Sequence, residues 1–140
     1  MTIPSVTGPK RAYPVARETI EFLGLDGFAD VPASAITVGL LKKLEVARAL
    51  ATRPSLVLLD EVMAGLTPAE IKDMMGVVES LPGRGVTVVW VEHVMAAIMK
   101  VAQRIVVLHH GERIAEGTPE EIATDPTVID AYLGKGLVDA

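Results

Sequence analysis

One stretch decides the fold of this 140-residue chain: Ser55-Leu56-Val57-Leu58-Leu59-Asp60-Glu61. Four consecutive aliphatic residues end on two carboxylates, Pro54 precedes the run, and a loop with glycine and proline follows it. A short apolar run between such breakers predicts a strand buried on both faces of a parallel sheet. Ligands of α/β proteins bind at the carboxyl ends of strands. The two acids therefore either end the strand in solvent or serve a metal–phosphate complex.

The composition fits a single domain with a hydrophobic core, because half of the residues are apolar. No apolar run approaches the roughly 18 residues that a membrane span needs. Residues 1–13 carry Lys10 and Arg11 without an apolar core, so no signal peptide is expected. The chain has no cysteine and a net charge of −5. Disulfides and a basic surface for nucleic acid are therefore not expected.

A second apolar run, residues 86–91, closes on Glu92-His93. Between the two runs, residues 67–81 show apolar residues at helical spacing, so the sequence predicts a strand–helix–strand unit. A right-handed crossover makes the two strands parallel and puts their carboxyl ends at one edge of the sheet. We therefore expect His93 and Glu61 to face one crevice.

Helix boundaries are marked by capping residues. Thr67 and Glu70 form a capping box with proline between them, and Thr118 and Glu121 repeat it. Residues 36–39 lead into a second predicted helix, which runs to about residue 51 and has Thr37 as its N-cap; Gly39 stands just before or within its first turn. The apolar face of this helix is expected on Leu40, Leu41, Leu44, Ala47 and Ala51. Its first turn can offer backbone N–H groups to an anion, or it is an ordinary capped helix.

The residues after His93 predict a third buried strand at 104–108, a hairpin partner at 112–116 and short helices up to residue 133. A helix from Pro14 to Leu23 and an extended lead-in before it are expected at the amino end.

These motifs together resemble those of the ATP-binding cassette (ABC) ATPases. The stretch 36–50 is similar to the signature motif and its helix, Leu56–Glu61 to the Walker B strand, Ala64–Thr67 to the D-loop, and His93 to the switch histidine. The resemblance spans about residues 15–133. The wording Val91-Glu92-His93 and the carboxyl-terminal residues look most like the subunits that power branched-chain amino acid importers.

The resemblance implies an α/β fold: a partial P-loop NTPase (ABC ATPase) fold with parallel strands, flanking helices, a C-terminal β-hairpin and short helices. It divides the chain into an extended lead-in over 1–13, a partial helical subdomain with the signature-like helix over 14–53, and the C-terminal part of the ATPase core over 54–140.

The resemblance also implies roles for the residues at the strand ends. Asp60 would organise Mg²⁺, Glu61 would polarise the water that attacks ATP, and His93 would contact the γ-phosphate. Glu61 and His93 are thus the expected catalytic residues, and Asp60 the expected metal residue.

A second group is implied to meet a neighbouring subunit. Thr37, Val38 and Gly39 would press on ATP held by a second, facing ATPase subunit, and Thr67 would lie at the subunit seam. Val38 stands where the family usually has glycine, Leu40 where glutamine is common, and Thr67 where the D-loop usually has aspartate.

The sequence lacks the motifs with which members of the family bind the phosphates of ATP. No G-x-x-x-x-G-K-[ST] motif occurs, and the only glutamine is Gln103, so the Walker A loop and the Q-loop are both missing. The chain thus corresponds to the C-terminal part of a cassette, and we do not expect it to hydrolyse ATP alone. Because the Walker A segment is missing, the strands at 86–91 and 104–108 would have unpaired backbone edges. We therefore expect either that these two strands pair directly or that elements are exchanged between chains in an oligomer.

The expected function is that of a truncated ATP-binding subunit of an ABC importer for branched-chain amino acids. The implied partners are transmembrane permease subunits and a second ATPase subunit, at the cytoplasmic face of the cell membrane and without insertion of this chain. One alternative is a non-catalytic cassette remnant that acts as an interaction or regulatory protein. Another is an unrelated α/β enzyme that uses Glu61 and His93 for other chemistry.

Overall fold

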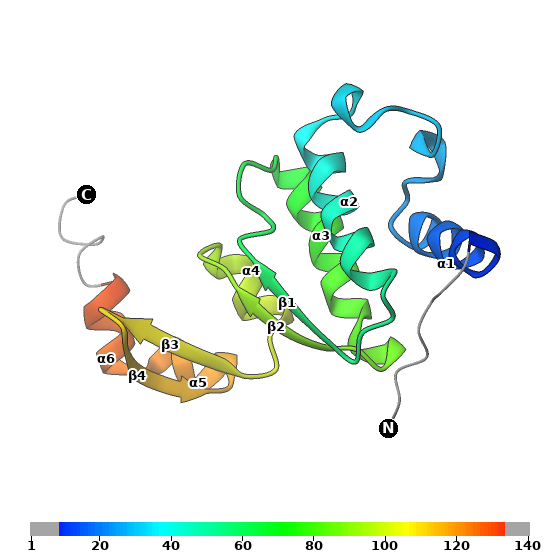
Figure 1. Ribbon diagram of the computed structural model, residues 1–140. Helices are drawn as coiled ribbons and strands as arrows, with labels where there is room; N and C mark the ends of the chain where they lie inside the picture. Colours follow the sequence, from blue (N-terminus) through cyan, green and yellow to red (C-terminus); the bar gives the residue numbers. More distant parts are fainter. Residues whose placement is uncertain (1–8, 134–140) are drawn as a thin grey trace. The chain divides into compact units, whose positions relative to one another are not determined.

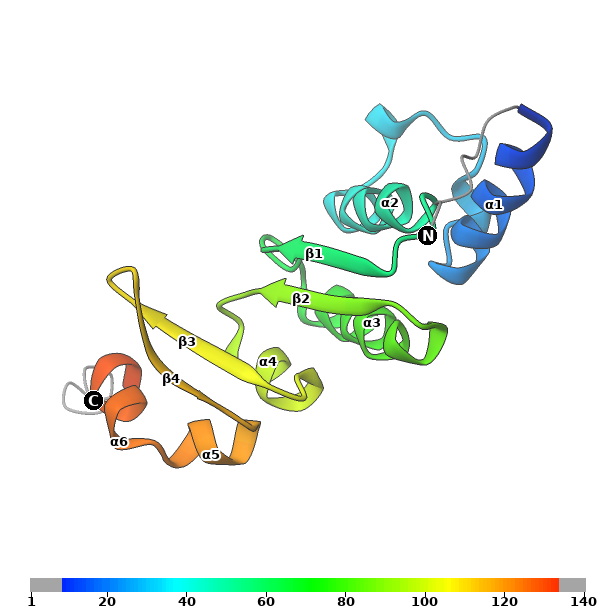
Figure 2. The same cartoon turned by 60° about the horizontal axis from the view of Figure 1, so that its bottom comes forward.

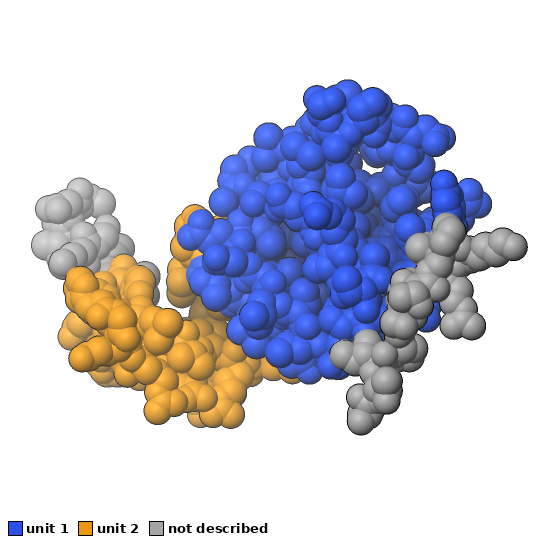
Figure 3. Space-filling model, viewed as in Figure 1, with its two compact units in different colours: residues 1–92 blue, residues 93–140 orange. Residues whose placement is uncertain are grey.

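The computed structural model describes residues 9–133 (Figure 1). The chain divides into two compact units, residues 1–92 and residues 93–140 (Figure 3). The boundary that the sequence predicted between residues 53 and 54 lies inside the first unit.

The first unit alternates helices and strands in the order α1 (Pro9–Phe22), η1 (Asp26–Phe28), η2 (Ala33–Ala35), α2 (Val38–Leu50), β1 (Leu56–Asp60), α3 (Pro68–Ser80), η3 (Pro82–Arg84) and β2 (Thr87–Val91). The prediction of an extended lead-in is wrong for residues 9–13, which are helical; residues 1–8 lie outside the described residues. Pro9 takes the first helical position, where its missing N–H costs nothing, and Pro14 lies inside the helix.

The predicted strand–helix–strand unit is confirmed. β1 and β2 pair in parallel, from Leu56 opposite Thr87 to Asp60 opposite Val91. Both arrows therefore end at the same edge, as Figure 2 shows. α3 connects the two strands, and α2 packs on β1 and on α1.

The prediction that β1 is buried on both faces is wrong. Val57 and Leu59 are buried, whereas the alternate residues Leu56 and Leu58 are exposed, Leu58 to 71 %. β2 likewise exposes Val89. The reason is that the described residues of the first unit cover only one face of the two strands. An apolar run predicts that a strand is buried, but it does not say which segment of which chain covers each face.

The second unit contains α4 (Met95–Val101), β3 (Ile105–His109), β4 (Glu112–Gly117), α5 (Pro119–Thr124), α6 (Pro126–Val128) and the π-helical turn η4 (Ile129–Leu133). The predicted hairpin is confirmed, because β3 pairs antiparallel with β4. α5 and α6 pack on β4 (Figure 2). The expected burial of β3 is wrong on one face, where Val106 is 52 % exposed.

Each strand in residues 9–133 has one partner strand, which belongs to the same unit. The pairing of β2 with β3, or an exchange in an oligomer, stays a prediction. None of the helices in the described range combines the length and the apolar character that a bilayer span requires.

Candidate functional site

The two acids that opened the sequence analysis lie where parallel strands present ligand-binding residues. Asp60 is the last residue of β1 and Glu61 follows it, and both are exposed. The Glu61 N–H donates to the carbonyl oxygen of Val91 at 2.9 Å. The backbone on which the acids stand is therefore tied to the carboxyl end of β2.

Glu61 has a left-handed backbone conformation, with φ of +45°. Such a conformation costs a non-glycine residue about 1–2 kcal/mol, because Cβ approaches the following carbonyl oxygen. The turn that follows is closed by bonds from Ala64 N–H to Glu61 O at 3.1 Å and from Leu66 N–H to Met63 O at 3.2 Å. Strained residues of this kind persist where the surrounding structure holds them, and they cluster at functional sites.

Glu92 is a member of this site that the sequence analysis did not assign. Its Oε1 accepts a hydrogen bond from the Met63 N–H at 2.9 Å, in a partly buried place. The available signal was its position, because Glu92 follows the end of β2 as Glu61 follows the end of β1.

The strand end suits a metal that brings its other ligands with it. No group of three or more His, Cys, Asp or Glu residues able to enclose a metal is found within residues 9–133. Mg²⁺ does not need one, since it is commonly held by one or two carboxylates together with waters and substrate phosphates. The exposed carboxylate of Asp60 fits that mode of binding.

The predicted N-cap of α2 is confirmed. The Thr37 hydroxyl accepts from the Leu40 N–H at 3.4 Å. Gly39 follows in the first turn and is buried. A Cβ placed on Gly39 would lie 2.0 Å from Oε1 of Glu70 on α3, so a side chain at this position would displace the Glu70 carboxylate.

Glu70 in turn closes the predicted capping box at Thr67, which is also confirmed. The Thr67 N–H and hydroxyl both donate to its Oε2 at 2.8 Å. These bonds, and in a smaller part the charge of Lys43, lower the pKa of Glu70 below its ordinary value of 4.5. The structure thus brings Thr37 and Gly39 to one place with Thr67, with the Glu70 carboxylate between the two helix starts.

Acidification should weaken the first unit through Glu70. The carboxyl of the unfolded chain has its ordinary pKa of 4.5, and the folded pKa is lower. The stabilisation is therefore complete above pH 4.5 and is lost as the pH falls through the folded pKa. We expect the difference in unfolding free energy between wild type and Glu70→Gln, from urea titrations, to shrink over that window.

A second variant tests the cause of this shift. Thr67→Ala removes the hydroxyl donor and should raise the pKa of Glu70 towards its ordinary value, as measured by NMR titration of the side chain. An unchanged pKa in Thr67→Ala, with a pH-independent stability difference in Glu70→Gln, would contradict the assignment.

The two remaining predicted residues lie apart from these contacts. Val38 opens α2 and is 58 % exposed, as a residue expected to meet a facing subunit must be. His93 is exposed and is the first residue of the second unit, and its meeting with Glu61 stays a prediction.

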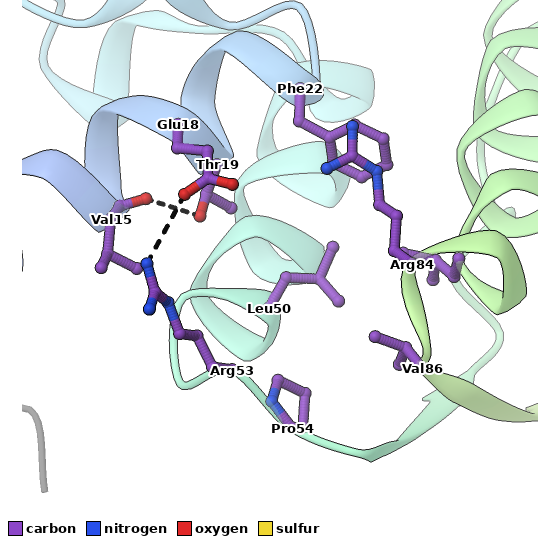
Figure 4. A pocket seen from close by; sticks show the side chains of 10 residues that line it. Val15, Glu18, Thr19, Phe22, Leu50, Arg53, Pro54, Arg84 and Val86 are labelled. Atoms are coloured by element: carbon purple, nitrogen blue, oxygen red, sulfur yellow. Dashed lines mark hydrogen bonds and ion pairs between the residues drawn. The ribbon is translucent and has the colours of Figure 1, made fainter. Parts of the chain in front are cut away.

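A pocket of about 480 Å³ opens elsewhere in the first unit, and Figure 4 shows its lining. The Arg53 guanidinium pairs with Glu18 at 3.6 Å, and the Arg84 guanidinium stacks 3.8 Å above the Phe22 ring. Arg53 and Arg84 precede β1 and β2, so the pocket lies at the amino ends of the strands. It is therefore at the edge of the sheet opposite to Asp60.

Comparisons with known proteins show which proteins this chain resembles in sequence and fold. Residues 112–137 match a family model described as branched-chain amino acid ATP-binding cassette transporter. BraF of Pseudomonas aeruginosa, a high-affinity branched-chain amino acid transport ATP-binding protein, is 39% identical over 127 residues, which are 90% of this chain and 50% of BraF. LptB of Haemophilus influenzae, a lipopolysaccharide export system ATP-binding protein, is 33% identical over 127 residues, 91% of this chain and 53% of LptB.

The fold has the same relatives. MJ1267 in its ADP conformation, an ATP-binding cassette of an ABC transporter, superposes with a TM-score of 0.82 at 28% identity, over 94% of this chain and 53% of that one. The chain thus spans about half the length of the relatives it matches. Sequence and fold agree that this chain belongs to the ATP-binding cassette family of transporter ATPases, of which it represents part of a cassette.

Proposed function

We propose that this chain supplies the catalytic carboxylates of an ATPase site that powers a branched-chain amino acid importer. The observation that carries the proposal is the position of Asp60 and Glu61 at the carboxyl end of a parallel strand, beside the end of β2. The likeness to BraF supports the class of transported solute. LptB, a lipopolysaccharide export protein, is also similar to this chain, so sequence identity of about one third is compatible with a different transported molecule.

The residues divide the chemistry between them. Glu61 would accept a proton from the water that attacks the γ-phosphate, and Asp60 would hold Mg²⁺. Bound Mg²⁺ neutralises charge on the phosphates. His93 donates a hydrogen bond to the γ-phosphate, while Thr37 and Gly39 present the start of α2 to the nucleotide of a second subunit.

The phosphates need a cradle that these residues do not form. The family holds the β- and γ-phosphates with the backbone and lysine of the Walker A loop, and this sequence contains no such motif. We therefore propose that the chain acts with a polypeptide that carries this loop, together with permease subunits at the cytoplasmic face of the membrane. Leu58 and Val89 on the exposed face of β1 and β2 are apolar surface that such a polypeptide would cover.

The proposal predicts that the chain alone neither binds nor hydrolyses ATP. Hydrolysis should appear when the full chain is mixed with the part of BraF that this chain does not span, and the Asp60→Ala variant should abolish it. Binding is measured by titration of Mg²⁺–ATP and hydrolysis by phosphate release. A chain that alone binds ATP with a Kd of ~1 mM or tighter, in the range of typical substrate affinities, would contradict the need for the loop.

A non-catalytic regulatory role is the other outcome of the same mixture. It is supported if the two polypeptides form a stable complex that hydrolyses no ATP with either wild type or Asp60→Ala.

A further inference from the structure

Glu92 connects two loops that are far apart in the sequence. It directly follows β2, and its Oε1 accepts from the backbone N–H of Met63, 29 positions earlier, at 2.9 Å. Met63 lies in the turn that follows β1, and its side chain is 1 % exposed. The bond is partly buried, which makes a carboxylate acceptor stronger than it would be in water.

The turn that Glu92 holds is the one that aims Glu61. On the amino side, the Glu61 N–H is bonded to Val91 O, the backbone oxygen next to Glu92. On the carboxyl side, Met63 N–H is bonded to the Glu92 carboxylate. The left-handed Glu61 thus lies between two bonds that both lead to the end of β2.

A left-handed non-glycine residue persists only where its surroundings leave it no alternative. The ladder bond at Glu61 fixes the point where the chain leaves the sheet, but it leaves free the direction of the chain beyond that point. The bond from Met63 to Glu92 fixes that direction relative to β2, together with the bond from Ala64 N–H to Glu61 O that closes the turn itself. The buried side chains of Val62 and Met63 add packing on the same segment.

We propose that Glu92 is a positioning residue: it holds the turn at residues 61–63 and thereby fixes the direction in which the Glu61 carboxylate points. The inference rests on the proposed function, since it is the role of Glu61 as a base that makes this direction matter. A base must stand within hydrogen-bond reach of the proton it accepts, and small displacements cost rate without changing affinity.

The first experiment measures the clamp itself, by amide hydrogen exchange in the full chain without nucleotide. Glu92→Ala should speed exchange at the Met63 amide roughly tenfold or more, because the amide loses the protection that a hydrogen bond to a charged group provides. Glu92→Gln keeps an acceptor at the same reach and should retain most of the protection. The amide of Thr87, bonded to Ser55 O at 2.8 Å at the other end of the strands, is the internal reference and should not change.

Two further variants keep the exchange experiment decisive. Glu92→Asp shortens the side chain by one methylene and should lose the Met63 protection, even if Glu92→Ala fails to fold. Glu79→Ala removes an exposed glutamate from α3 and should leave Met63 unchanged. Equal Met63 exchange in wild type, Glu92→Ala and Glu92→Asp would overturn the clamp.

The second experiment measures what the clamp does for Glu61. In the mixture with the loop-bearing part of BraF, Glu92→Ala should lower kcat roughly tenfold with an unchanged KM for Mg²⁺–ATP, and Glu92→Gln should restore kcat. A faster Met63 exchange with an unchanged kcat would overturn the positioning role. If the wild-type mixture hydrolyses no ATP, the proposed function fails, whereas the exchange experiment still decides whether Glu92 holds the turn.

Discussion

Replacing Glu61 by glutamine is expected to cut ATP hydrolysis by the assembled site roughly 10²–10⁴-fold, the usual contribution of a positioned general base. The amide has the shape of the carboxylate but does not accept the proton of the attacking water. The affinity for Mg²⁺–ATP should not fall, because Glu61 acts on the water and Asp60 serves the metal. Phosphate release and nucleotide titration on the same mixture of polypeptides measure the two quantities.

The glutamine variant isolates chemistry from folding. Glutamine keeps the length of the side chain and faces the same cost at φ +45°, so the turn that carries it should persist. Glu79→Gln, the same change at an exposed position of α3, is the matched control and should hydrolyse ATP at the wild-type rate. A Glu61→Gln site with wild-type turnover would show that another group takes the proton.

Sequence reasoning succeeded where a local pattern fixes the outcome. The capping box of Thr67 and Glu70 was predictable because both partners lie within one helical turn. The parallel pairing of β1 and β2 was predictable because the handedness of a crossover leaves few alternatives. On α3, the apolar residues at helical spacing over 67–81 include Met74 and Val78, which the structure buries.

It failed where tertiary packing chooses between local options. Of the face expected on α2, Ala47 is buried as predicted, but Leu41 is 36 % exposed, and the helix buries Val46, which was not expected there. α2 packs on both α1 and β1, so the directions of two neighbours set its buried side. A helix with apolar residues around much of its circumference carries no single periodic signal for that choice.

The candidate site shows the same division. Asp60 and Glu61 could be located because they end an apolar run. The bond from Met63 to Glu92 could not, since it depends on the shape of a turn whose left-handed residue is a glutamate and not a glycine. Local propensity gives no indication of such a conformation.

The largest effect on stability is expected from Met74→Ala. Met74 lies in α3 with 0 % exposure, and it is among the largest fully buried side chains of the described residues. Truncating a buried methionine to alanine costs about 2–5 kcal/mol, from the lost transfer free energy and the cavity left behind. A unit of this size has roughly 5–14 kcal/mol of stability in total, so the variant should lose a large part of it. The measurement is urea denaturation followed by the fluorescence of Trp90, the chain's single tryptophan, which lies in β2 and so reports on the first unit.

Two neighbouring variants show whether the loss comes from burial at this position. Met74→Leu keeps the volume and should cost less than about 1.5 kcal/mol, so it should give a measurable transition even if Met74→Ala does not fold. Met75→Ala makes the same deletion one position along α3, where the side chain is only half-buried, and should cost less than Met74→Ala. Equal losses at Met74 and Met75 would show that the helix, and not the core beneath it, determines the effect. That result would also contradict the packing of α3 on which the path from β1 to β2, and with it the position of Glu61 beside Val91, depends.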